Sequence, residues 1–250
     1  MWSLPFVPNA YSDEVLGTWL ARIQVLNGSG AWRMLFESAG AGSTLTGPLF
    51  DLVNHSESLA RVFEGLHTDY TSAILQRTTL PYWSALAGDE ARRVPGVPQL
   101  RMPQTRANIP ALDLVLLRRT GFGKLQVHRW YCPVCIALDR EEGRLPYLRR
   151  RHQLPTVFHC LEHRVPLQHG CPKCGADIFI GRPDLFLVET ACPCGFDLLS
   201  APVQTGCIPP FFRRLAKVSE DALNIQSVDW SLSALRAWLT DRLSALGGRL

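Results

Sequence analysis

The residues best suited to chemistry in this chain are four short clusters of cysteine and histidine in its middle third. Two residues between donors allow a tight turn to aim both side chains at one ion, and zinc takes four such ligands. The glycines that follow Cys174 and Cys194 permit the positive φ that these turns often need. The sequence therefore predicts two zinc ions. The predicted ligands are, in order, Cys132, Cys135, Cys160, His163, Cys171, Cys174, Cys192 and Cys194.

Pairing in sequence order would place the first four of these ligands on one ion and the last four on the other, although a crossed pairing stays open. Cys207, His159 and His169 lie outside the paired clusters. We expect Cys207 to be a small buried apolar residue and the two histidines to be surface groups.

Both predicted zinc sites are of the structural kind. A hydrolytic zinc ion usually has three protein ligands and one position for water, whereas four protein ligands leave no place for substrate. We also expect free thiols rather than disulfides, because an intracellular compartment keeps cysteines reduced. A zinc hydrolase or thiol redox protein would need an open coordination position or a reactive thiol pair. The chain has no phosphate-binding glycine loop, paired catalytic carboxylates or nucleophile elbow, so we predict that it is not an enzyme.

Basic residues are concentrated around the first cluster. Between residues 117 and 153, nine arginines and lysines stand against three acidic residues, although the whole chain carries only +4. With Trp130 and Tyr147 among them, these cations could neutralise phosphates and stack on nucleotides; a solvated surface or an acidic protein partner are the alternatives. The predicted nucleic-acid contacts are Arg118, Arg119, Lys124, Arg129, Arg149, Arg150, Arg151 and His152.

The part of the chain before the cysteine clusters is expected to consist mainly of helices. Ser12 is a candidate N-cap for a helix that carries Val15, Leu16, Trp19, Leu20 and Ile23 on one face and ends at Asn27 and Gly28. Further helices are expected at about 31–38, 56–66 and 70–76, the last ending before Pro81. The segment 92–110 contains four prolines and is expected to be a linker, and 112–117 is an apolar run too short to assign.

After Pro209 and Pro210 the chain is expected to become helical again, with a carboxy-terminal helix from about Asp229 that stops at Gly247 and Gly248. The predicted fold is therefore mainly α with small zinc-stabilised α+β modules. We expect a helical region over 1–110, a double zinc-finger region over 111–206 and a helical tail over 207–250. No apolar stretch is long enough to cross a membrane and no signal peptide is evident, so we expect a cytoplasmic protein.

Two stretches resemble the TniQ/TnsD family of transposition target-selection proteins. They are LPFVPNAYSDEVLGTWLARI at 4–23, similar to the family's first helix, and WYCPVCIALDREEGRLPYLRRRHQLPTVFHCLEHRVPLQHGCPKCGADI at 130–178, similar to its zinc-finger signature. The resemblance implies a helix-turn-helix-like amino-terminal region and zinc ligands at the eight positions above.

The resemblance also implies a function in a bacterial cell, at the nucleoid when the protein is active. Family members join a target, either bound DNA or an RNA-guided complex, to an AAA+ ATPase of the TnsC/TniB kind, and some act as homodimers. The chain is shorter than the long DNA-reading members, which favours an adaptor that depends on another component for the target site. The alternative is a zinc-ribbon transcription regulator that binds DNA without such a partner.

Overall fold

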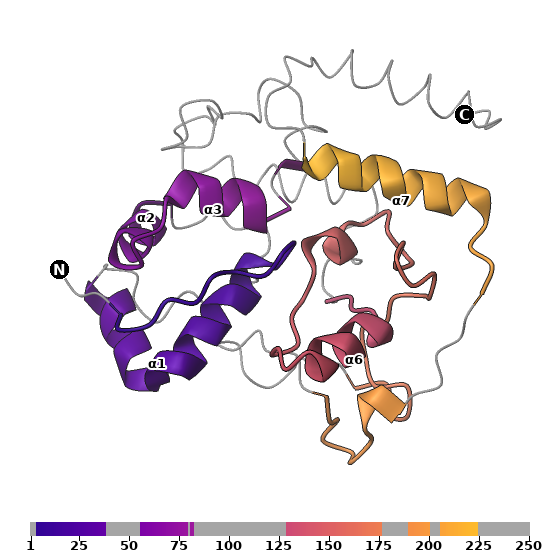
Figure 1. Cartoon of the computed structure of the whole chain (residues 1–250), viewed down its shortest axis with the longest axis horizontal. Helices are drawn as coiled ribbons and strands as arrows, with labels where there is room; N and C mark the ends of the chain where they lie inside the picture. Colours follow the sequence, from indigo (N-terminus) through magenta and orange to yellow (C-terminus); the bar gives the residue numbers. More distant parts are fainter. Residues whose placement is uncertain are drawn as a thin grey trace.

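The computed structural model describes residues 4–38, 56–79, 81–82, 129–176, 190–200 and 206–224. In this part of the chain the fold is helical, and strand pairing is limited to four isolated bridges. The mainly α expectation is confirmed, whereas the helix-turn-helix-like arrangement stays a prediction. No described helix is long and apolar enough to cross a membrane. The helices, shown in Figure 1, are α1 (Leu16–Ser38), α2 (Ser56–Gly65), α3 (Tyr70–Arg77), α6 (Pro133–Glu141), η3 (Arg150–Gln153), η4 (Leu198–Ser200) and α7 (Pro210–Leu223).

The first helix begins later than the sequence indicates. Asp13 has a positive φ of 59°, and Glu14 forms an isolated antiparallel bridge with Arg149. Both residues therefore precede the helix, and the prediction that Ser12 caps it is wrong. The carboxylate of Glu14 instead accepts a hydrogen bond from the backbone amide of Tyr11 and pairs with Arg22 inside the protein.

Helix α1 bends at Gly28, where the sequence predicts a helix end. Gly28 has φ 80° and ψ 156°, so α1 consists of two helical segments joined by one non-helical residue. The Asn27 side chain donates to the carbonyl of Ile23 and so satisfies one of the groups that the first segment leaves free. The predicted helix over 31–38 is the second segment.

Helices α2 and α3 pack against α1. The ring of Phe63 stacks at 6.0 Å on Trp19, and Phe63 is completely buried. Asp69 caps α3 by accepting a hydrogen bond from the amide of Ser72. Both helices lie where the sequence predicts them, because their apolar spacing and caps are local signals.

The amino-terminal segment is joined to residues 147–151 by main-chain and side-chain bonds. The amide of Val15 donates to the carbonyl of Leu148 at 2.9 Å, and the amide of Arg150 donates to the carbonyl of Asp13 at 2.7 Å. Two side-chain bonds flank this pairing, from the Tyr147 hydroxyl to the Ser12 carbonyl and from the Leu148 amide to the Thr18 hydroxyl. The first helix and the cysteine-rich region therefore pack as one unit.

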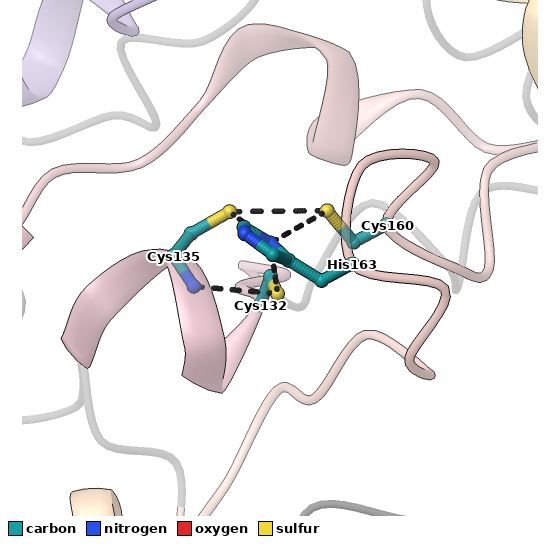
Figure 2. Close-up of side chains that lie close together, drawn as sticks. All are labelled: Cys132, Cys135, Cys160 and His163. Atoms are coloured by element: carbon teal, nitrogen blue, oxygen red, sulfur yellow. Dashed lines mark hydrogen bonds between the residues drawn. The ribbon is translucent and has the colours of Figure 1, made fainter. Parts of the chain in front are cut away.

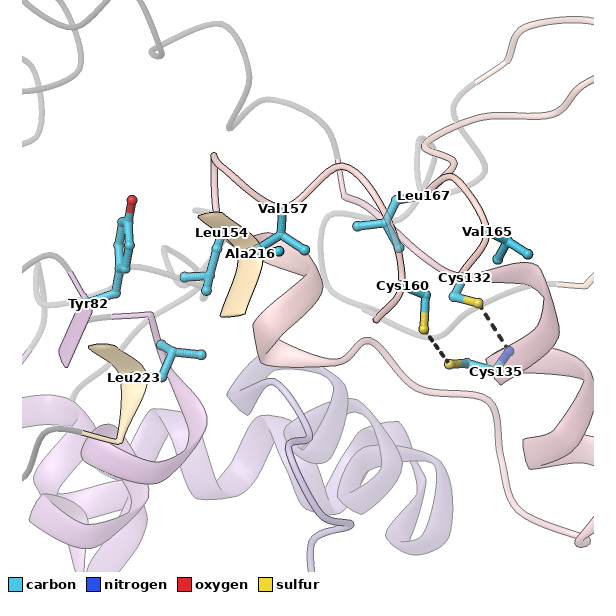
Figure 3. Close-up of a cluster of buried hydrophobic side chains, with 10 residues drawn as sticks. All are labelled: Tyr82, Cys132, Cys135, Leu154, Val157, Cys160, Val165, Leu167, Ala216 and Leu223. Carbon is cyan, nitrogen blue, oxygen red and sulfur yellow. Dashed lines mark hydrogen bonds between the residues drawn. The ribbon is translucent and has the colours of Figure 1, made fainter. Parts of the chain in front are cut away.

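A second core lies between the cysteine-rich region and α7, as Figure 3 shows. Its buried members include Tyr82, Leu154 and Val157 after η3, and Ala216 and Leu223 on α7. Side chains from all three of the expected regions thus share one core. The predicted linker at 92–110, the run at 112–117 and the helix from Asp229 lie outside the described residues.

Candidate metal centres

The first group of donors is built from the start of α6 and a tight turn. Cys132 is the N-cap of α6, and its sulfur accepts a hydrogen bond from the amide of Cys135 at 3.5 Å. Pro133 suits the first helical position because no hydrogen bond is required from its nitrogen there. Cys160 and His163 lie on a turn closed by the amide of Arg164, which donates to the Cys160 carbonyl at 2.8 Å.

The four donor atoms of this group meet at distances that suit one tetrahedral ion (Figure 2). The Nδ1 atom of His163 lies 3.5, 3.3 and 3.4 Å from the sulfurs of Cys132, Cys135 and Cys160. The sulfurs of Cys135 and Cys160 are 3.8 Å apart. Ligands about 2.3 Å from a central zinc ion would be separated by about 3.8 Å for a sulfur pair, which agrees with this spacing.

The second group brings together Cys171, Cys174, Cys192 and Cys194. Its sulfurs lie 3.8 Å apart for Cys171 and Cys194 and 3.5 Å apart for Cys174 and Cys192. Both distances are too long for a disulfide bond of about 2.05 Å. The structure therefore groups all eight predicted ligands in sequence order, and the crossed pairing is not observed.

Glycines shape both turns of the second group. The amide of Gly175 donates to the Cys171 carbonyl, and that of Gly195 donates to the Cys192 carbonyl, both at 2.8 Å. The φ angles of these glycines are 71° and 80°. An L-amino acid with a side chain would be strained in this conformation, which explains the residue type at both positions.

The thiols of each group lie close enough to change one another's pKa. Hydrogen bonds with Cys132 and Cys135 lower the pKa of Cys160, and hydrogen bonds with Cys132 and Cys160 raise the pKa of Cys135. In the second group desolvation opposes ionisation of Cys171, but hydrogen bonds from the amides of Cys174 and Lys173 bring its pKa to about 7. A bound cation would replace the shared protons, since metal binding requires thiolates. The S₃N and S₄ donor sets are those that zinc prefers.

The two groups differ in exposure. Cys132, Cys135 and Cys160 are all buried, whereas Cys174 and Cys194 of the second group are exposed. Next to the first group, His152 is buried and its Nε2 atom has no hydrogen-bond partner among the described residues. Burial lowers the pKa of His152, which favours a neutral ring.

The basic residues near the first group are mostly used inside the protein. Arg149 makes two hydrogen bonds to the carboxylate of Asp139, at 3.0 and 2.9 Å, and both side chains are buried. Arg150 is also buried and donates to the carbonyl of Leu75. Arg151 is partly exposed but pairs with Glu162 at 2.7 Å.

Arg149, Arg150 and His152 are all more than nine-tenths buried, so little of their surface is open to a phosphate. Arg129 is partly buried and has an interaction within the protein. Arg118, Arg119 and Lys124 lie outside the described residues. Contact with nucleic acid stays a prediction for all eight residues.

The sequence also predicts the burial of Cys207 and the surface position of His159 and His169. Cys207 is exposed, so the expectation of a buried apolar residue is wrong. His159 and His169 are partly buried, and His169 packs edge-on against Trp130 at 4.6 Å. The buried acids Glu14 and Asp139 were missed, because a carboxylate at the edge of an apolar helical pattern normally indicates a solvent-facing position.

Comparison with known proteins supports a single family. The TniQ family model matches residues 5–167, which is more than half of the chain. The match includes α1, α2, α3, α6 and the first donor group, while the second donor group and α7 lie beyond it. No curated protein matches the sequence. Since the family model covers most of the chain, including its first metal centre, this protein belongs to the TniQ family, whose members are associated with transposition and generally act as non-catalytic adaptors.

Proposed function

We propose that this protein is a non-enzymatic adaptor that links a transposition target, either DNA or an RNA-guided complex, to an AAA+ ATPase of the TnsC/TniB type. The observation that carries the proposal is the TniQ match over residues 5–167. The two described ends of the matched segment pack together, because residues 13–15 bond to residues 148–150. Two zinc ions, held by the groups described above, would act as structural ions in this adaptor.

An exposed apolar patch on this segment is a suitable surface for the ATPase. Phe6, Val25 and Leu26 are 54%, 50% and 48% exposed. Two hydrogen bonds between the backbone of Phe6 and the side chain of Asn27 hold Phe6 next to the end of the first α1 segment. Exposed large apolar side chains that are neighbours on a rigid element often mark a protein interface. We refer to Phe6, Val25 and Leu26 as the α1 patch.

The test is reconstitution with the ATPase encoded beside this chain. Size-exclusion chromatography and electron microscopy, with ATP and target DNA or the guide complex present, should show a joint complex. The double variant Val25→Asp, Leu26→Asp should lose it. A matched control, Leu138→Asp with Leu145→Asp, changes two other exposed leucines and should keep it.

Two outcomes would contradict the proposal. If the wild-type protein forms no complex with the ATPase in any nucleotide state, the adaptor function fails. If it instead protects specific operator-like DNA without any partner, the chain is a transcription regulator. Equal loss of the complex in both double variants would reject the α1 patch as the ATPase-binding surface and leave the adaptor function in place.

A further inference from the structure

The charges on α7 are arranged against the helix dipole. Arg213, Arg214 and Lys217 come before the acidic residues of the helix, Glu220 and Asp221. The first turn has no acidic residue and the last turn no basic residue. Cations toward the amino end and acids toward the carboxyl end do not complement the helix dipole, so this arrangement is unfavourable for the helix. A function outside the helix would account for it.

Local contacts compensate little of this cost. Arg213 and Lys217 are one turn apart on the same side, and like charges at this spacing repel. Lys217 pairs with Asp221 at 2.7 Å, but both groups are largely exposed. Within the described part of the chain, the guanidinium groups of Arg213 and Arg214 have no hydrogen bond or ion pair, and both residues are exposed. The two arginines are therefore available to a partner.

The opposite side of α7 is already occupied. Ala216, Ser219 and Leu223 are buried, and the hydroxyl of Ser219 lies 2.6 Å from that of Thr156. Figure 3 shows Ala216 and Leu223 within the second core. With 100° between successive residues, Arg214 lies opposite the buried side of the helix, and Arg213 and Lys217 lie on the flank next to it. We call these three residues the α7 cationic side.

The composition of the α7 cationic side favours nucleic acid over protein. Two polar residues, Asp221 and Asn224, lie beside these three cations, and the small ring of Pro210 is the one apolar group of the helix in this sector. Protein interfaces generally have an apolar or aromatic centre, whereas protein–DNA interfaces are polar and positively charged.

The exposed aromatic residues of α7, Phe211 and Phe212, lie in its first turn and not between the cations. Phe211 and Phe212 contact each other at 5.5 Å, and Phe212 packs against Phe158 at the start of the helix. A single-strand binder would interleave aromatic rings with its cations. The separation of the two residue types favours the backbone of a duplex.

We propose that the α7 cationic side binds the phosphate backbone of double-stranded DNA without reading its sequence. Arg213 and Lys217, about 6 Å apart along the helix, can contact neighbouring phosphates of one strand, and Arg214 extends the contact to the side. The proposed adaptor function is used here only to identify the bound phosphates as those of target DNA. The surface lies beyond residue 167, outside the segment matched by the family model, so it is a property of this chain's own carboxy-terminal part.

The test is fluorescence anisotropy of the full chain with a labelled mixed-sequence DNA duplex over a series of salt concentrations. The variant Arg213→Gln, Arg214→Gln, Lys217→Gln should lower duplex affinity at least about tenfold. It should also reduce the slope of log K against log salt by about 2 to 3, because each phosphate contact contributes about 0.9. Circular dichroism and zinc content should be unchanged, because all three side chains are exposed.

The matched control removes the same charge elsewhere. Arg61→Gln, Arg164→Asn, Lys173→Gln changes three other exposed cations, and asparagine suits the positive φ of Arg164. Equal effects of the two triple variants, or no effect of the α7 variant, would overturn the proposal. Tighter binding of single-stranded DNA or of an RNA duplex would reject duplex DNA as the ligand. Absence of duplex binding by the wild type would also overturn it. The adaptor function is tested separately, by the ATPase reconstitution.

Discussion

At the scale of single residues, the buried charges next to the first donor group form a defined arrangement. A zinc ion with three thiolates and a neutral histidine carries one net negative charge. The buried Arg149 lies close enough to Cys135 to lower the pKa of that thiol, although hydrogen bonding with Cys132 and Cys160 has the larger and opposite effect. Asp139 fixes the guanidinium of Arg149 with two hydrogen bonds. The pair is neutral as a whole, but it holds a fixed guanidinium near the thiol of Cys135.

We expect Asp139→Asn to destabilise the protein strongly. The substitution leaves the buried Arg149 without a charged partner, and breaking a buried pair in this way costs about 3 to 5 kcal/mol. Urea unfolding monitored by circular dichroism measures the change. Glu142→Gln is the control: Glu142 pairs with Arg144 at the surface, where a salt bridge contributes at most about 1 kcal/mol. Similar losses in the two variants would contradict this interpretation.

The ligands could be predicted from sequence and their supporting residues could not. Paired spacing is a local property, so Cys132, Cys135 and the other donors can be recognised directly. The positions of Arg149 and Arg150 depend on tertiary contacts with Asp139 and Leu75. A run of three arginines looks the same in sequence whether it lies on the surface or inside the protein.

At the scale of elements, the bend in α1 is the feature with the clearest sequence cause. Gly28 has a backbone conformation that is almost restricted to glycine, and a β-carbon placed there would meet no atom within 4 Å. Any cost of substitution at this position therefore comes from the backbone and not from crowding.

We expect Gly28→Ala to cost about 1 to 3 kcal/mol. Gly30→Ala is a matched comparison two residues away, because Gly30 is helical and also has open space around it. That change should stabilise the protein by about 0.5 to 1 kcal/mol. Thermal unfolding of both variants shows whether each substitution raises or lowers the stability. A stabilising Gly28→Ala would show that the bend is not required.

Element boundaries were predictable where local signals determine them. The end of the first α1 segment, the position of α3 and the start of α7 follow from Gly28, Asp69 and Pro210. The start of α1 was not predictable, because Glu14 pairs with Arg149 instead of beginning the helix. A partner so distant in sequence overrides the local preference of Ser12 for capping.

At the scale of the whole molecule, hydrogen bonds and an ion pair join the first donor group to the segment that precedes α1. Arg151 connects Asp13 to Glu162, the residue before His163. The second donor group is attached differently, through packing of α6 against η4 and a hydrogen bond from Arg140 to Thr190. The consequences of metal loss should therefore differ between the two centres.

We expect Cys160→Ser and Cys194→Ser each to reduce the zinc content by one ion, but only the first to expose α1. Elemental analysis measures the zinc, and hydrogen–deuterium exchange over residues 16–27 measures the opening of α1. Loss of the buried centre removes the support of residues 147–151, whereas loss of the exposed centre leaves it in place. Undiminished protection of α1 in Cys160→Ser would show that the two parts fold independently.

The hydrogen bond from the Arg151 amide to Asp13 joins residues 138 positions apart. During synthesis on the ribosome, Asp13 and Glu14 emerge long before their partners exist. Until residue 151 has left the exit tunnel, the nascent chain has only part of the contacts that hold its first helix. Chaperone capture of this early segment, and acquisition of the metal while the middle of the chain is still emerging, would then determine how much functional protein a cell obtains.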